Sequence, residues 1–72
     1  MSRQLKSLRV LKGYTVQDMA QAIGKAMSSY STKERGDTSF DDNEKIIIAK
    51  MLDMNYEQFN AIFFDGKLEL KG

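Results

Sequence analysis

The chain has 72 residues, enough for one domain with a small hydrophobic core. It contains no cysteine and no histidine, which excludes a disulfide framework, a thiolate or imidazole zinc site and a histidine general base. The net charge of +1 conceals an asymmetry, because residues 1–36 carry 7 − 2 = +5 and residues 37–72 carry 4 − 8 = −4. The basic half would attract a polyanion, and the acidic half suits a basic protein.

The first predicted helix covers residues 2–12. Leu5, Leu8 and Leu11 recur at intervals of three and predict one apolar face. Gly13 follows the last turn and predicts the end of the helix.

The second predicted helix is short and ends at residue 23. Thr15 is a good N-cap, and Asp18 suits the positive N-terminal end of the helix. Gly24 then predicts a sharp turn. Ala20 is small enough to let this helix cross the next one closely.

The third predicted helix covers residues 26–34, and its helix propensity is weak. Ala26 is a poor N-cap, and four of the seven residues from Ser28 onward are serine or threonine. Gly36 predicts the end of this helix.

The fourth and fifth predicted helices begin with clear capping patterns. Asp41 and Glu44 form a D-x-x-E variant of the capping box before the apolar run "KIIIAKML". Asn55 caps the fifth helix with Gln58 at the third position, and "FNAIFF" supplies its core face.

The C-terminal stretch "DGKLELKG" changes period. Leu68 and Leu70 alternate with charged residues after an Asp65–Gly66 turn pair. Two interpretations remain open here: a frayed, disordered terminus, or an extended strand whose apolar face pairs with a second copy.

Four stretches of the sequence carry a family resemblance. The segments "LRVLKGYTVQDMAQAIG" and "SSYSTKERG" resemble the helix-turn-helix family of temperate-phage repressors and Cro-type proteins, also called the xenobiotic-response-element family. The segments "YSTKERGDTSF" and "IAKMLDMNYEQFNAIFF" are similar to small regulators of phages of Gram-positive bacteria. The resemblance covers about residues 3–64.

The resemblance implies an all-α, compact five-helix domain of the lambda-repressor type over residues 1–64, followed by a tail over residues 65–72. It also implies a salt bridge between Arg9 and Glu34 that ties the first helix to the third. The predicted core consists of Leu8, Leu11, Met19, Ile23, Tyr30, Ile48, Leu52, Phe59 and Ile62.

The same resemblance implies that the DNA-facing positions open the second helix and continue along the third. Val16 stands where a glutamine usually anchors a phosphate, and Gln17 follows it. The third helix lacks the arginine, glutamine or asparagine that commonly contact base edges, whereas its lysines and arginine would contact phosphates. The predicted DNA-binding residues are Gln17, Lys25, Met27, Ser28, Ser29, Thr32, Lys33 and Arg35.

These sparse base-contacting residues leave two functions open. The first is a transcriptional regulator of a phage lysis–lysogeny switch that binds operator DNA. The second is a modulator or antirepressor that binds the phage's own lysogenic repressor through Met27, Ser28 and Thr32, because methionine suits adaptable protein interfaces. The acidic half of the chain would then resemble DNA toward a basic partner.

An enzyme is the third hypothesis, and we predict that the protein is not one. The serines of the third helix have no histidine partner, and the acidic residues near Asp41 are explained by helix capping. We therefore expect no catalytic residue, no cofactor and no metal. No signal peptide or membrane-spanning stretch is apparent. The expected location is the cytoplasm of a bacterial host, and the expected partners are double-stranded operator DNA and a second copy or a related phage repressor, with no membrane and no small-molecule substrate.

Overall fold

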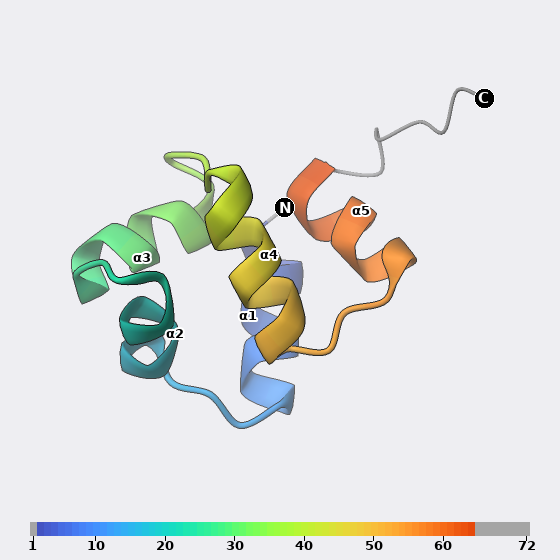
Figure 1. The fold of residues 1–72 in the computed structure, drawn as a ribbon, viewed down its shortest axis with the longest axis horizontal. Helices are drawn as coiled ribbons and strands as arrows, with labels where there is room; N and C mark the ends of the chain where they lie inside the picture. Colours follow the sequence, from blue (N-terminus) through green and yellow to red (C-terminus); the bar gives the residue numbers. More distant parts are fainter. Residues whose placement is uncertain (1, 65–72) are drawn as a thin grey trace.

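The computed structural model describes residues 2–64, which form five α-helices and contain no β-strand (Figure 1). The helices are α1 (Ser2–Leu11), α2 (Val16–Ile23), α3 (Met27–Arg35), α4 (Asp42–Met51) and α5 (Tyr56–Phe64). This confirms the predicted all-α class and the number of helices. None of these helices is long and apolar enough to cross a bilayer. The stretch around Leu68 and Leu70, for which a disordered terminus and an extended strand both remain open, lies outside the described residues.

Side chains cap three of the helices at their N-termini, as the sequence predicts. Thr15 accepts a hydrogen bond from the backbone N–H of Asp18, whose carboxylate accepts one from the N–H of Thr15. Asp41 and Glu44 make the same reciprocal pair at α4. At α5, the Asn55 side chain accepts from the N–H of Gln58, and the Gln58 side chain accepts in return. Each pair satisfies two backbone donors that the first helical turn leaves free.

Two glycines end α2 and α3. Gly24 has φ +71° and Gly36 has φ +92°, both in the left-handed region that glycine enters without a Cβ penalty. The N–H of each glycine donates to carbonyls of the preceding turn. The predicted bounds of α3 are displaced by one residue, since the helix covers Met27–Arg35 and Ala26 lies outside it as the N-cap.

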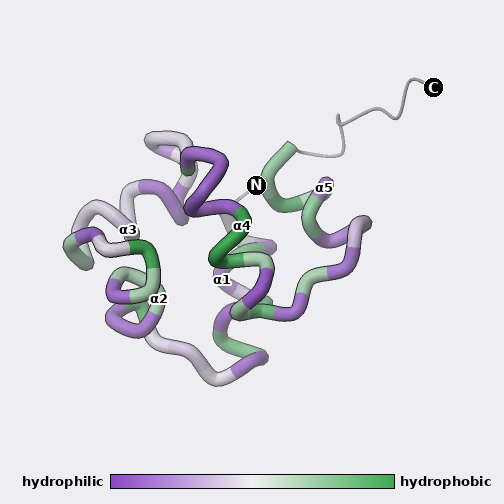
Figure 2. The backbone as a smooth tube through the Cα atoms, in the orientation of Figure 1, coloured by the Kyte–Doolittle hydropathy of each residue, from purple (hydrophilic) through white to green (hydrophobic). Residues whose placement is uncertain are grey.

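The helices pack around one core. Helix α2 contacts α3 and α4, and α1 contacts α3 and α5. In Figure 1, α2 and α3 lie together at one end of the molecule, α5 lies at the other end, and α4 crosses between them in front of α1. Figure 2 shows that the residues in the middle of α4 are strongly hydrophobic. The buried apolar residues are Leu5, Leu8, Met19, Ala20, Ile23, Tyr30, Phe40, Ile48, Leu52 and Ile62.

The prediction that Leu11 belongs to the core is wrong, because this side chain is 78% exposed. Successive residues rotate by about 100° around a helix, so each step of three falls about 60° short of a full turn. Leu11 therefore lies about 120° around the helix from Leu5. The buried face of α1 instead consists of Leu5, Leu8 and Arg9.

Two phenylalanines also differ from the predicted core. Phe59 is only partly buried, with its ring 5.0 Å from that of Phe63. Phe40, which the prediction omits, is buried, and its ring centroid lies 5.8 Å from Tyr30 and 5.7 Å from Phe63. Phe40 stands directly before the N-cap of α4, so the α3–α4 connection contributes to the core although it has no helical period.

Candidate functional site

Helices α2 and α3 form a helix–turn–helix unit joined by residues 24–26. Ala20 of α2 is buried, and its carbonyl accepts a hydrogen bond from the N–H of Lys25. The N–H of Tyr30 donates to the carbonyl of Ala26 across the start of α3. The turn is therefore held by backbone hydrogen bonds, and these fix the direction in which α3 leaves α2.

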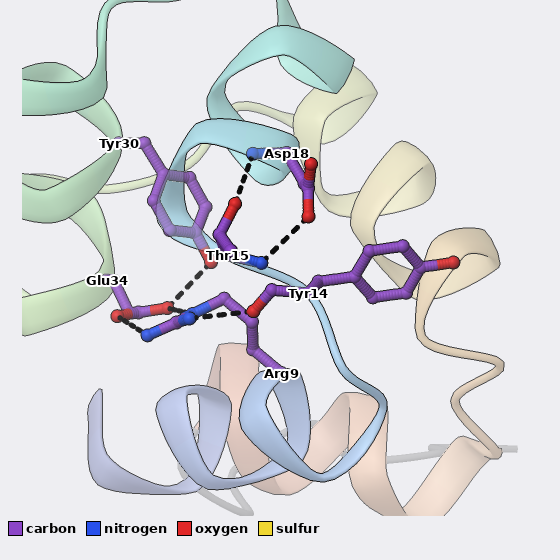
Figure 3. Close-up of polar contacts among 6 residues, drawn as sticks. All are labelled: Arg9, Tyr14, Thr15, Asp18, Tyr30 and Glu34. Atoms are coloured by element: carbon purple, nitrogen blue, oxygen red, sulfur yellow. Dashed lines mark hydrogen bonds and ion pairs between the residues drawn. The ribbon is translucent and has the colours of Figure 1, made fainter.

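The inner side of α3 is fixed by a buried polar network (Figure 3). The Nε atom of Arg9 donates to Oε2 of Glu34 at 2.8 Å, and its Nη2 atom donates to Oε1 at 3.4 Å. The hydroxyl of Tyr30 donates to the same Oε2 at 2.8 Å. The Nη1 atom of Arg9 also donates to the backbone carbonyl of Tyr14 at 2.9 Å. The predicted Arg9–Glu34 salt bridge is confirmed, and it connects α1, α3 and the α1–α2 turn.

Burial and hydrogen bonding shift the pKa values of this network. The hydrogen bond to Glu34 raises the pKa of Arg9 and outweighs the opposing effect of burial. Burial raises the pKa of Tyr30 well above its ordinary value, and the hydrogen bond to the Glu34 carboxylate adds to that effect. The network therefore contains a charged arginine and a neutral phenol throughout the neutral pH range.

The outer side of α3 is open. Met27 is 51% exposed, and Ser28 and Ser29 are exposed beside it. Thr32 is half-buried, and its hydroxyl donates to the backbone carbonyl of Ser28 at 2.8 Å. This hydroxyl proton is used within the helix, so Thr32 offers a ligand its methyl group and an acceptor oxygen.

The N-termini of α2 and α3 differ in how they are capped. At α2, Val16 packs against the core, Gln17 is exposed, and the Thr15–Asp18 capping box occupies two backbone donors. At α3, Ala26 has no side chain that accepts a hydrogen bond. Backbone donors at the start of α3 are therefore left to water or a ligand, and at the start of α2 the exposed side chain is Gln17.

Every predicted phosphate-binding cation of this surface has an acidic neighbour. The Nζ atom of Lys33 lies 2.8 Å from Oε1 and 3.0 Å from Oε2 of Glu44. The Nζ atom of Lys25 lies 3.3 Å from Oε2 of the same residue. Arg35 pairs with Asp37 at 3.1 Å, where both side chains are largely exposed. The positive charge of α3 is therefore partly neutralised from within the protein.

Glu44 is the more buried of these two acidic neighbours, because it is only 3% exposed whereas Asp37 lies on the surface. Burial would raise the pKa of its carboxyl group, but hydrogen bonds from Lys33, from the Asp41 backbone and from Lys25 outweigh that effect and lower the pKa. Glu44 therefore stays ionised at neutral pH while it faces two cations.

The structure brings most of the predicted site residues together. The residues from Lys25 to Arg35 lie on one helix and its preceding turn, and Gln17 lies on the adjacent helix. Sequence reasoning assigned Glu44 to helix capping alone and missed its pairing with Lys33, which is 11 residues away along the chain. No local pattern signals that pairing, because it depends on where α4 lies relative to the α2–α3 unit.

Within residues 2–64, no group of three acidic side chains could hold a metal ion. Comparison of the chain with protein-family models, with curated proteins and with solved structures finds no match.

Proposed function

We propose that the protein is a transcriptional regulator of a phage lysis–lysogeny switch and that it binds operator DNA through α3. The division of α3 into a fixed inner side and an open outer side carries this proposal. Tyr30 and Glu34 anchor the helix by hydrogen bonds, whereas Met27, Ser28 and Ser29 are exposed. A rigid helix with an exposed side fits the major groove of B-DNA. The family resemblance of residues 3–64 supports the same assignment.

The outer side of α3 would contact bases by shape and by weak polar contacts. Serine hydroxyls can hydrogen-bond to several bases, and methyl groups can pack against thymine. Lys25, Lys33 and Arg35 would contribute phosphate contacts that depend on salt. We therefore expect modest sequence preference, with DNA shape contributing to it.

Fluorescence anisotropy on a labelled duplex from the control region beside the gene tests this proposal. A scrambled duplex of the same composition is the control, and both are titrated at low and near-physiological salt. Tighter binding to the control-region duplex is expected. Equal binding to both duplexes, abolished by salt, would contradict operator recognition.

Variants of the outer side sharpen the same experiment. Ser28→Ala and Thr32→Ala should change the preference between duplexes, since these side chains would lie against base edges. Ser39→Ala, at an exposed serine in the α3–α4 connection, is the matched control and should leave the preference unchanged. Uniform weakening on both duplexes by Ser28→Ala and Thr32→Ala would exclude base contacts at these positions.

The neutralised lysines favour a second candidate function. Glu44 forms ion pairs with Lys25 and Lys33 and partly neutralises their charge. Met27 is an exposed apolar side chain on the same surface. Such a surface suits a protein groove, so the alternative is a modulator that binds the phage's own repressor through Met27, Ser28 and Thr32. Met27→Glu should abolish that complex in a pull-down with the purified repressor. Unchanged binding by Met27→Glu would remove this alternative.

We further propose that the protein acts as a homodimer through α1 and α5. A groove of about 480 Å³ between these helices is lined by the apolar residues Leu8, Leu11, Ala61 and Ile62 and by the polar residues Gln4, Ser7, Glu57 and Gln58. Val10 is a further exposed apolar side chain on α1. Small domains often gain stability by association. Sedimentation equilibrium should give a dimer mass that falls to the monomer mass in Leu11→Lys. A monomer mass for the wild-type protein would leave a heterodimer with a related repressor as the arrangement to test.

A further inference from the structure

Glu44 is a buried acid whose two cationic partners belong to the proposed DNA-binding surface. We propose that Glu44 competes with DNA phosphates for Lys25 and Lys33. This competition would set how strongly α3 and its preceding turn bind a polyanion. This inference rests on the proposed function, since it concerns how strongly the same surface binds DNA. Glu44 itself does not contact the ligand and acts through Lys25 and Lys33.

The geometry makes the carboxylate the fixed member of the cluster and the lysines the movable members. Oε1 of Glu44 accepts hydrogen bonds from the backbone N–H of Asp41 at 2.9 Å and from Nζ of Lys33 at 2.8 Å. The backbone N–H of Glu44 donates to the Asp41 side chain in return. Glu44 is therefore anchored to the first turn of α4 by the capping box, and it cannot follow a lysine toward solvent.

The two lysines, in contrast, keep access to solvent. The side chain of Lys25 is 44% exposed and that of Lys33 is 17% exposed, whereas the Glu44 side chain is 4% exposed. A lysine ammonium sits on a flexible four-carbon stem, so it can turn from a carboxylate to a nearby phosphate. A DNA phosphate must therefore draw each ammonium away from Glu44 before it gains the full contact.

The charge balance predicts a measurable consequence. Lys25 and Lys33 with Glu44 carry a combined charge of 2 − 1 = +1, and without the carboxylate charge they would carry +2. Each phosphate neutralised by a free cation contributes about 0.9 to the slope of log K against log salt for B-DNA. Glu44 lowers this slope in the wild-type protein and reduces affinity for any duplex, whatever its sequence.

Glu44→Gln is the most direct test, because glutamine at the third helical position can complete a capping box. The amide oxygen can still accept from Asp41, while the negative charge is removed. Glu57→Gln is the matched control, since Glu57 is an exposed acid in the first turn of α5 and its replacement changes the net charge equally. Glu57 also lines the α1–α5 groove, so sedimentation equilibrium verifies that both variants keep the wild-type mass.

Both variants are titrated with a labelled random-sequence duplex at several salt concentrations, with circular dichroism to verify folding. For Glu44→Gln, we expect the salt slope to steepen by about one relative to Glu57→Gln, because one carboxylate charge is removed from the lysine cluster. We also expect binding about tenfold tighter at low salt. Adding Lys33→Gln to Glu44→Gln should remove most of this gain. Equal slopes for Glu44→Gln and Glu57→Gln would overturn the proposal.

A second variant keeps the test decisive if Glu44→Gln does not fold. Glu44→Asp retains the charge and withdraws the carboxylate from the lysines, and aspartate at the same helical position already completes the box at α2 through Asp18. Glu44→Asp should bind the random duplex more tightly than Glu57→Asp, and equal affinity would overturn the proposal.

The two proposals fail in different ways. If the wild-type protein binds the control-region and scrambled duplexes equally, operator binding is contradicted. The salt slopes of Glu44→Gln and Glu57→Gln on the random-sequence duplex would still decide the role of Glu44. Clear operator discrimination with equal slopes for Glu44→Gln and Glu57→Gln would keep the function and exclude the competitor.

Discussion

Glu34 and Glu44 are both buried acids with cationic partners, yet they lie in different surroundings. Glu34 is 8% exposed, and its partner Arg9 is 7% exposed, so the whole pair is inside the protein. Glu44 is equally buried, but Lys25 and Lys33 reach toward solvent. The same chemistry therefore serves stability at Glu34 and surface charge at Glu44, and the exposure of the partner decides which.

The difference follows from what remains when one partner is lost. A buried arginine without its carboxylate stays desolvated, which is costly. A partly exposed lysine without its carboxylate turns to water, which costs little. Loss of Glu34 should therefore lower the free energy of unfolding more than loss of Glu44.

The largest effect is expected for Glu34→Ala. Removal of this carboxylate leaves Arg9 buried and unpaired and leaves the Tyr30 hydroxyl without its acceptor. The free energy of unfolding should fall by about 3–5 kcal/mol. Urea denaturation monitored by circular dichroism measures it. The double variant Arg9→Met/Glu34→Leu should recover part of the loss, and equal or greater destabilisation by the double variant would contradict the stranded-charge explanation.

Tyr30→Phe should cost about 1.5–3 kcal/mol, because it removes a hydrogen bond to a charged acceptor. The pKa of Tyr30 is raised in the folded protein, so its neutral form stabilises the fold below the unfolded pKa of about 10, and this stability is lost as pH rises above it. Thermal unfolding between pH 8 and 11 should show less alkaline destabilisation in Tyr30→Phe than in the wild type. Parallel curves would show that Tyr30 does not cause the alkaline loss.

Glu44→Gln should cost only about 1 kcal/mol, since the capping hydrogen bond remains and two partly exposed ion pairs are lost. The pKa of Glu44 is lowered in the folded protein, so its charge stabilises the fold above the unfolded pKa of about 4.5 and loses that effect as pH falls through the lower folded value. Acid unfolding should therefore be shallower in Glu44→Gln. A cost equal to that of Glu34→Ala would erase the contrast between the two carboxylates.

The smallest effect is expected for Ala26→Ser, which adds the missing cap to α3 and should stabilise the protein by about 0.5 kcal/mol. A rise in the thermal midpoint with unchanged far-ultraviolet circular dichroism would agree with this. Ser39→Ala, in the exposed α3–α4 connection, is a matched control at which no change is expected. A lower midpoint for Ala26→Ser would mean that the backbone at residue 26 cannot accept a capping side chain.

The helix starts and stops could be predicted because each depends on residues within a few positions of one another. Thr15, Asp41 and Asn55 each bond to the residue three positions later, and Gly24 and Gly36 supply the left-handed conformation that ends a helix. The core was predicted less well. A spacing of three residues places Leu11 away from the buried face of α1, and the buried Phe40 lies in a connection that has no helical period.

The candidate site divides in the same manner. Position along the chain was sufficient to group residues 25–35 on one helix and its preceding turn, and the family resemblance was sufficient to pair Arg9 with Glu34. Neither could indicate that Lys25 and Lys33 share one carboxylate, because Glu44 belongs to another helix and its capping role already explained it locally.

The sequence by itself determined five helices, their caps and an asymmetric charge, because hydrogen bonding within one turn and the φ preference of glycine are local properties. Only the tertiary structure decided which charges remain available at the surface. The approach of α4 to the α2–α3 unit sets the distance between Glu44 and the two lysines, and electrostatic interaction depends on that distance and on burial, not on separation along the chain.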